Sequence, residues 1–342
     1  MYSNLLGEVA EEIDSLGIPV LSDVSQSPFV PEIIHGHHHL EAMTALLQFP
    51  DVPAVYLCHG FVPWQERAPL HPRVMEYAAV DEPTRHHCIK NGVPAQKIRL
   101  ILNFVDTERF KPRGPLPAAP KRALVFSNYA SENNCLPFVR KACQRAGLEL
   151  DVRGYESGTY ERSPETFLGK YDIVFAKARC ALEAMAAGTA VVLCDAVGIG
   201  PMVSSALIGD LRLRNFGRTT LNFPLSAKVV FEQINRYNAD DAAQVSRKIR
   251  SEASLEQTLP SIINLYKEAI LQFSRLRFDP REELPAIAEY VRSLSDLIKA
   301  DHIRMSYDHN WFRPAQVGEH PHRQIIRHSL LRRIRNFLAK LI

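Results

Sequence analysis

The chain has 342 residues, a length that suits two domains of ordinary size. Hydrophobic residues make up 46% of it and charged residues 23%, a composition typical of soluble globular proteins. The formal net charge is +3, but residues 318–342 carry six Lys or Arg side chains against one Glu, so the remainder is slightly acidic. This distribution excludes a general nucleic-acid-binding surface outside the tail.

No apolar run reaches the roughly 18 residues that a membrane-spanning helix requires, and residues 1–14 are too acidic for a secretory signal. The six cysteines are scattered, form no CxxC pair and lie mostly in apolar contexts. This pattern argues against a disulfide framework and against a structural zinc site. We therefore expect a cytoplasmic protein in a reducing environment.

Short apolar runs alternate with helical stretches in the first half of the chain. Strands are predicted at residues 18–21, 33–35, 54–58, 75–80 and 98–102, and helices near 5–15, 40–49 and 83–91. This alternation predicts an α/β domain with a parallel sheet. The strand, Gly-rich loop and crossover helix that normally open a Rossmann-like domain have no counterpart here, so we expect this domain to be incomplete by about one βαβ unit.

Four prolines in residues 111–122 cannot continue a helix or an inner strand, and they predict an interdomain linker. The alternation then restarts, with strands predicted at 123–127, 148–152, 172–175 and 190–194, and helices near 137–146, 227–237, 239–253, 261–276 and 281–299. The sequence therefore predicts a partial N-terminal domain at 1–110, a second Rossmann-like domain at 123–278 and a helical extension at 279–342.

Residues 171–203 form the most informative segment of the sequence. A strand at 172–175 precedes a polar loop, a helix led by Leu182 and Glu183, a stop at Gly188, a strand at 190–194 that leads to Asp195, and a turn with Gly198 and Gly200. This order predicts a parallel crossover. The loop after its first strand and the N-terminus of its helix attract phosphate, and Lys177 and Arg179 lie there.

Five segments resemble the nucleotide-sugar glycosyltransferases of the GT-B fold, family-4 (group 1) type. They are residues 31–43, 52–60, 92–110 and 171–203, and the closing helices before about residue 275. The resemblance implies two Rossmann-like domains, of which the N-terminal one binds the acceptor and the C-terminal one binds the nucleotide diphosphate sugar. It also implies no cofactor and no metal, because basic side chains and a helix N-terminus neutralise the donor phosphates.

The resemblance implies donor-binding roles for Lys177, Arg179 and Glu183, the last as an acceptor of ribose hydroxyl hydrogen bonds. Phe175 stands where the family has the first Glu of its Glu, seven residues, Glu pattern, and residues 126–134 lack the usual basic side chain. Lys177 and Arg179 are therefore the substitutes we expect for the diphosphate, against the alternative of two solvent-facing cations. Gly198 and Gly200 suit close backbone approach to a ligand or a plain tight turn, and Asn215 and Gly217 are further candidates.

On the acceptor side, His59 matches the family's His-Gly and is expected to orient the acceptor or to donate to the sugar. Asp81 ends the next strand and is either an acceptor-binding residue or the N-cap of a helix. Asn103 aligns with the family's Asn-Gly-Val-Asp motif, but Phe104 replaces the glycine, so we expect a backbone without positive φ there.

Residues 35–39 contain four histidines, which raises the alternative of a zinc site. Adjacent histidines on a strand-to-helix turn point in different directions, and no HExxH motif or carboxylate partner accompanies them. We therefore expect no metal, with His37 and His38 on the acceptor side of the active-site cleft.

Residues 324–342 predict a basic amphipathic helix with Ile326, Leu330, Ile334, Phe337 and Leu341 on one face. Such a helix binds an anionic membrane surface, which would suit a lipid-linked acceptor and a peripheral location on the inner face of the membrane. The alternative is a helix packed on the core or on another subunit.

The resemblance therefore implies a glycosyltransferase of polysaccharide or glycan biosynthesis, transferring a sugar from a nucleotide diphosphate donor to a glycan, lipid-linked or small-molecule acceptor, with retention expected by analogy with the family. A second hypothesis is a non-catalytic nucleotide- or sugar-binding protein on a degenerate GT-B scaffold, favoured by Phe175 and the missing basic residue. A GT-B-shaped isomerase needs a carboxylate pair that the sequence does not place. A zinc hydrolase on the histidine cluster is the remaining alternative.

Overall fold

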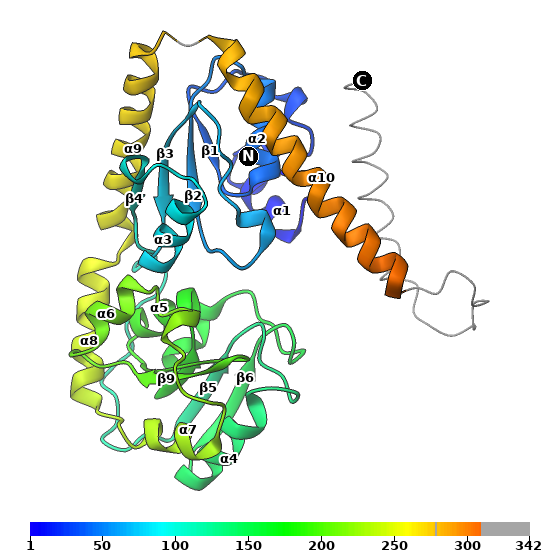
Figure 1. Ribbon diagram of the computed structural model, residues 1–342. Coiled ribbons are helices and arrows are strands. Elements are labelled where there is room, and N and C mark those ends of the chain that lie inside the picture. The colour runs from blue at the N-terminus through cyan, green and yellow to red at the C-terminus, as the bar shows by residue number, and fades with distance from the viewer. Residues whose placement is uncertain (278, 309–342) are drawn as a thin grey trace. The chain divides into compact units, whose positions relative to one another are not determined.

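A computed structural model describes residues 1–277 and 279–308 (Figure 1). The chain divides at residue 288 into two compact units, and the first contains two separate β-sheets with four and five strands. Helices connect the strands of both sheets, which gives the α/β class that the sequence predicts. The predicted linker lies between the last strand of the first sheet and the first strand of the second.

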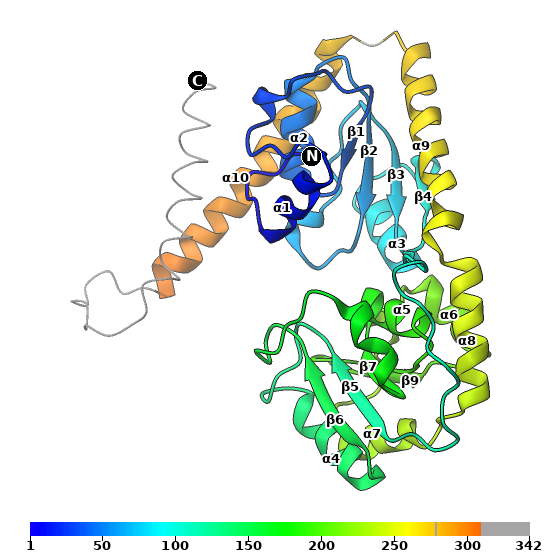
Figure 2. The same cartoon turned by 180° about the vertical axis from the view of Figure 1, so that it is seen from behind.

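The first sheet is entirely parallel, and its strands follow the order of the chain, β1-β2-β3-β4 (Figure 2). Its strands are β1 (Ile34–Gly36), β2 (Ala54–Cys58), β3 (Val74–Ala79) and β4 (Ile98–Leu100), and its connecting helices include α2 (His39–Gln48) and α3 (Glu82–Lys90). Every residue of β2 and β3 is buried, as expected for parallel strands that are covered on both faces. The carboxyl ends of β1 and β2 lead directly to the histidine-containing segments.

The predicted strand at 18–21 is wrong. Residues 18–20 have no regular structure, and Leu21 forms only an isolated bridge with Tyr2 after the helix α1 (Glu8–Ser15). Ile18 is 48% exposed, so this apolar run is not part of the core. Pro19 also lacks the N–H that a central strand would need.

The second sheet has the order β6-β5-β7-β8-β9, and only β9 is antiparallel to its neighbour. Its strands are β5 (Arg122–Phe126), β6 (Glu149–Arg153), β7 (Ile173–Ala176), β8 (Ala190–Asp195) and β9 (Gly198–Met202). Its helices are α4 (Leu136–Ala146), α5 (Ala178–Ala186), α6 (Ile208–Leu213), α7 (Ala227–Ile234) and α8 (Ala239–Glu252). The strand order reverses between β5 and β7, which is where doubly wound sheets bind ligands.

Two predictions in this half need correction. Gly198 and Gly200 do not form a turn, because both lie in β9 and are buried. The helix after β7 begins at Ala178 rather than near Leu182, so Arg179 belongs to its first turn. Strand β9 instead returns antiparallel to β8, and the chain turns at residues 196–197.

The predicted linker is fixed along the second sheet. The carboxylate of Asp172 accepts the backbone N–H groups of Lys121 and Arg122 at 2.8 and 3.0 Å, and it pairs with Arg113 at 2.9 Å. The backbone N–H of Arg113 also donates to the carbonyl of Ala187. These bonds order the proline-rich segment, although it has no regular secondary structure before β5.

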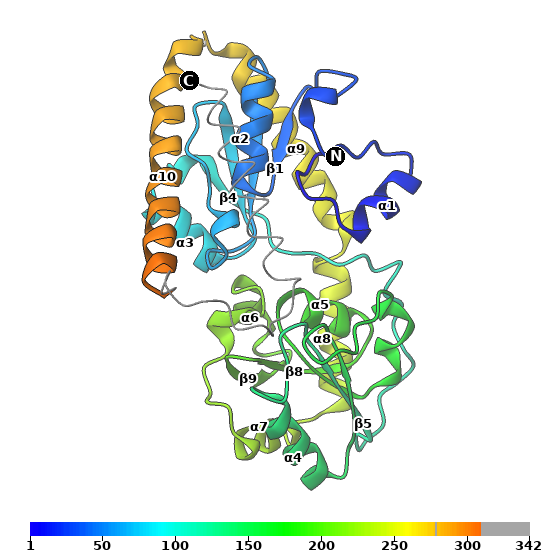
Figure 3. The same cartoon turned by 90° about the vertical axis from the view of Figure 1, so that its right-hand side faces the viewer.

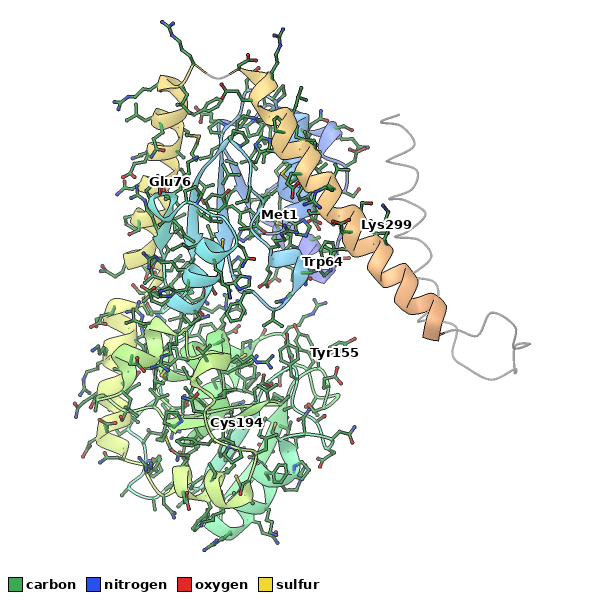
Figure 4. All side chains as sticks on the ribbon, in the orientation of Figure 1. Met1, Trp64, Glu76, Tyr155, Cys194 and Lys299 are labelled. Carbon is green, nitrogen blue, oxygen red and sulfur yellow. The ribbon has the colours of Figure 1, made fainter. Side chains whose placement is uncertain are left out.

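Helix α9 (Leu255–Arg275) contacts β2 and β3 of the first sheet, and its Leu265 and Ala269 are buried there. Gln272 donates to Glu76 of β3 at 2.8 Å, and Figure 4 shows Glu76 beside this helix. Helix α10 (Glu283–Asp308) begins with a buried ion pair between Glu283 and Arg73. No helix within 1–277 and 279–308 is long and apolar enough to cross a bilayer, and the predicted helix at 324–342 lies outside the described residues.

Candidate active site

Three side chains meet where the strand order of the second sheet reverses. Ser127 follows β5, Lys177 follows β7, and Asp195 ends β8. The Asp195 carboxylate accepts the Ser127 hydroxyl at 2.7 Å and pairs with the Lys177 ammonium at 2.8 Å. Lys177 also lies over the ring of Tyr129, with 4.7 Å from Nζ to the ring centroid. The position of the ammonium is therefore defined by Asp195 and Tyr129 at the carboxyl edge of the sheet.

The helix N-terminus beside Lys177 has the electrostatic character of an anion site. Lys177 is the N-cap residue of α5, and no side chain caps this helix. The N–H groups of a first helical turn have no partner within the helix, so they and the helix dipole favour negative charge. The sequence predicts that phosphate binds at this helix start, and binding of a donor there stays a prediction.

Strained backbone collects next to this helix start. Within the described residues, positive φ outside glycine occurs at Ala178 (49°), Asn215 (55°) and Phe216 (49°). The N–H of Ala178 donates to the carbonyl of Phe216 at 2.9 Å, so the two strained segments are bonded to each other. Such conformations cost about 1–3 kcal/mol each and cluster at functional sites.

Arg179 and Lys177 bind different carboxylates. The Nε of Arg179 donates to Oε1 of Glu183 at 3.0 Å, one helical turn along α5. Burial raises the pKa of Glu183, and the neighbouring charge of Arg179 acts in the opposite direction. The side chain of Arg179 is 75% exposed, whereas that of Lys177 is 25% exposed. The structure therefore fixes the lysine and leaves the arginine able to change partners.

On the first sheet, His37 follows β1 and His59 follows β2. The Nδ1 of His37 lies 2.6 Å from the Nε2 of His59. Burial lowers the pKa of His59 to about 4, with smaller contributions in the same direction from His37, His38 and Arg179 of α5. Asn103 and Asn215 are joined by a 2.9 Å side-chain hydrogen bond, so the predicted acceptor-side residue Asn103 contacts the strained loop before residue 217.

The remaining acceptor-side predictions have simpler surroundings. Asp81 is the N-cap of α3 and accepts the N–H of Thr84 at 2.7 Å, which is the structural alternative that the sequence left open. His38 occupies the N-cap position of α2 without capping it. Phe104 has no positive φ, as predicted. No group of three or more His, Cys, Asp or Glu side chains in the described part of the chain is arranged to hold a metal ion.

Residues 27–109 match the protein family Glycosyltransferase Family 4. The chain has the GT-B fold. Its fold is similar to that of a glycosyltransferase from Rickettsia africae ESF-5, with a TM-score of 0.56 and 15% identity over 78% of this chain and 88% of that one.

Two further solved structures share this fold. Anabaena HepE in complex with UDP-glucose has a TM-score of 0.55 and 12% identity, covering 80% of this chain and 91% of that one. Sucrose-phosphate synthase from Thermosynechococcus elongatus has a TM-score of 0.51 and 16% identity, covering 70% and 74%. No curated protein sequence matches the chain.

The sequence did not identify Ser127 and Asp195 as partners of the Lys177 site. Their positions depend on the strand order, which places the ends of β5 and β8 on either side of the end of β7, where Lys177 lies. An acidic residue at the end of a fully buried strand was the available indication for Asp195. Phe175 is fully buried in the core of the second sheet, so its side chain cannot replace the family's carboxylate.

A cavity of about 690 Å³ lies between α4 and α7, which are neighbours in Figure 3. Lys141, Arg145 and Ser226 are among the residues that line it. None of the predicted site residues lines it.

Gly200 is required by close packing between β9 and the segment that follows α6. A Cβ at Gly200 would lie 2.7 Å from the Thr220 carbonyl oxygen and 2.8 Å from the Cβ of Leu193. We expect Gly200→Ala to lower the free energy of unfolding by about 1–3 kcal/mol in urea titrations. Gly209→Ala is the matched control, because a Cβ there meets nothing within 4 Å, and equal midpoints for the two variants would contradict this account.

Acid should destabilise the fold through its neutral histidines. Burial lowers the pKa to about 4 in His35, His39, His59 and His71. The unfolded chain binds these protons near pH 6.5, so between about pH 6.5 and 4 it holds more protons than the folded chain. The free energy of unfolding therefore has its full value above that range and falls as the pH is lowered through it. Glu66 and Glu183, whose pKa values burial raises, have the opposite effect on the free energy of unfolding. Urea midpoints should therefore fall from pH 7.5 to pH 5, and a constant or rising midpoint would refute the assignment.

Proposed function

We propose that the chain transfers a sugar from a nucleotide diphosphate donor to a glycan, lipid-linked or small-molecule acceptor, without a metal ion and with retention at the anomeric carbon. The observation that carries this proposal is the Lys177 ammonium, held by Asp195 at the strand-order reversal and beside the uncapped start of α5. HepE, which shares the fold, was solved with UDP-glucose, and this supports a nucleotide-sugar donor here.

In this proposal the leaving diphosphate lies at the start of α5. Lys177 has three N–H donors, of which Asp195 uses one, so the others remain for phosphate oxygens. The helix dipole and the first-turn N–H groups that follow Ala178, whose own N–H donates to Phe216, stabilise the charge that develops as the glycosidic bond to the diphosphate breaks. These charges take the place of a metal ion.

Two other side chains orient the substrates in this proposal. Glu183 accepts ribose hydroxyl groups once Arg179 turns toward phosphate, because a carboxylate has more acceptor sites than its one bond to Arg179 uses. His59 orients the acceptor through its imidazole. Retention requires the acceptor oxygen to attack from the face that the diphosphate leaves, and the acceptor proton then goes to a diphosphate oxygen.

The test combines binding with turnover. A thermal-shift panel of nucleoside diphosphates and their sugars identifies the donor, because a ligand of the native state raises the melting temperature. Chromatography then measures release of the nucleoside diphosphate, with and without a chelator, and NMR of the product reports its anomeric configuration. Binding without release at any acceptor concentration would instead support the non-catalytic binding protein, which the buried Phe175 favours.

We also propose peripheral contact with an anionic membrane through residues 324–342. The five basic side chains of this segment supply the attraction, and each contributes about 1 kcal/mol near such a surface. Deletion of 324–342 should abolish sedimentation with anionic liposomes and leave donor binding unchanged. Equal sedimentation of the two proteins would contradict this part of the proposal.

A further inference from the structure

Three imidazole rings form a row at the carboxyl ends of β1 and β2. The ring centroids of His35 and His37 lie 4.4 Å apart, and those of His37 and His59 lie 4.9 Å apart with nearly parallel planes. The row follows from the parallel register, which pairs His35 with Val55 and Gly36 with Tyr56. The register therefore places His37 in contact with His59, the residue that is proposed to orient the acceptor.

The contact between His37 and His59 allows only one hydrogen between the two rings. With Nδ1 of His37 at 2.6 Å from Nε2 of His59, one nitrogen donates and the other accepts. Burial lowers the pKa of both residues, so each ring is neutral at pH 7 and carries a single hydrogen. The tautomer of His37 therefore determines the tautomer of His59.

The other end of the row is fixed by α9. The hydroxyl of Tyr266 lies 2.5 Å from Nδ1 of His35, and the two rings meet edge to face. His35 stacks on His37 through its ring face, so it restrains the position of His37 without bonding to it. His59 thus receives its orientation through a series of contacts that begins on α9.

We propose that His37 is a positioning residue that acts through His59: it fixes the ring and the tautomer of His59, so that Nδ1 of His59 is the atom presented to the acceptor hydroxyl. This inference rests on the proposed function, because it assigns a task to His37 in the same reaction. It gives a specific task to His37, which the sequence places on the acceptor side of the cleft. It requires no proton transfer along the row.

Amide substitutions test this assignment, because the side-chain amide of Asn occupies about the place of Nδ1 and that of Gln about the place of Nε2. His37→Ala should lower kcat on the order of 10²-fold with little change in the KM for the donor, since a misplaced orienting group costs about that much. His37→Asn, which keeps a partner at the Nδ1 position, should restore most of the rate, and His37→Gln should not. His86→Ala, on the exposed surface of α3, is the control and should match the unsubstituted chain.

A measurement that needs no enzymatic turnover distinguishes failure of the proposed transferase function from failure of the role proposed for His37. Nitrogen-15 NMR of the histidines should find one tautomer of His59 in the unsubstituted chain and a mixture in His37→Ala. If the unsubstituted chain turns over no donor, the proposed function fails and this spectrum alone decides the assignment. The inference is overturned if His37→Ala keeps its rate, if the Asn and Gln variants are equally impaired, or if the tautomer of His59 is unchanged. Urea titrations of each variant verify that it is folded.

Discussion

Replacement of Lys177 by alanine is expected to lower kcat with a nucleotide diphosphate sugar by about 10²–10³-fold, the usual cost of removing one preorganised charge from a leaving-group site. The ammonium is placed by Asp195 and Tyr129 at the start of α5, and no other basic side chain is bonded to Asp195 in the described part of the chain. The effect should appear in kcat, since the charge on the leaving diphosphate develops in the transition state.

The single substitution also leaves the buried Asp195 without its cation. Loss of one partner from a buried ion pair costs about 3–5 kcal/mol, so a loss of activity could reflect unfolding. The double variant Lys177→Met with Asp195→Asn removes both charges together and should recover most of the stability but none of the rate. Lys141→Ala, an exposed lysine of α4, should retain the full rate. A double variant that is folded and within threefold of the original rate would refute the role of Lys177.

Replacement of Arg73 by leucine is expected to lower the free energy of unfolding by about 3–5 kcal/mol, because it leaves a buried carboxylate without its partner. Arg73 has no exposed surface, and its guanidinium binds both carboxylate oxygens of Glu283 at 2.7 and 3.0 Å. It also donates to the carbonyls of Phe49 and Val52 after α2. One arginine thus joins the first sheet, the end of α2 and the start of α10.

Urea unfolding followed by circular dichroism measures this effect. The double variant Arg73→Leu with Glu283→Leu should be more stable than Arg73→Leu alone, since it buries no unpaired charge. Arg292→Ala removes two exposed ion pairs, with Glu289 and Asp296, and should leave the midpoint unchanged. Similar midpoints for Arg73→Leu and Arg292→Ala would show that the buried pair contributes little.

The buried parallel strands were the easiest elements to predict from the sequence. Residues 54–58 form β2 with the predicted bounds, because a short continuous apolar run is typical of a strand covered on both faces. The run at 18–21 is equally apolar but has no sheet to join, so periodicity alone could not distinguish it. The strand at 198–202 was missed because its glycines suggested a turn. In the structure these glycines allow close packing of β9 against neighbouring backbone.

Within the candidate site, the sequence could identify only the residues that directly follow a buried strand. Lys177 and His59 follow buried strands, and the carboxyl ends of parallel strands share one edge of a sheet. The partners of these residues depend on which strands are neighbours, so Asp195 and His37 could not be assigned to Lys177 and His59 beforehand. The roles of Arg179 and Glu183, which bind each other here, stay predictions.

Calorimetric titration of nucleoside diphosphates against the matching monophosphates tests most directly whether a diphosphate binds at the start of α5. For the donor base, we predict that the diphosphate binds at least about tenfold more tightly than the monophosphate, as expected for added charge-assisted hydrogen bonds. We also predict that the Lys177→Met, Asp195→Asn double variant loses this difference. Equal affinities for both nucleotides, or an undiminished preference in the double variant, would contradict the account.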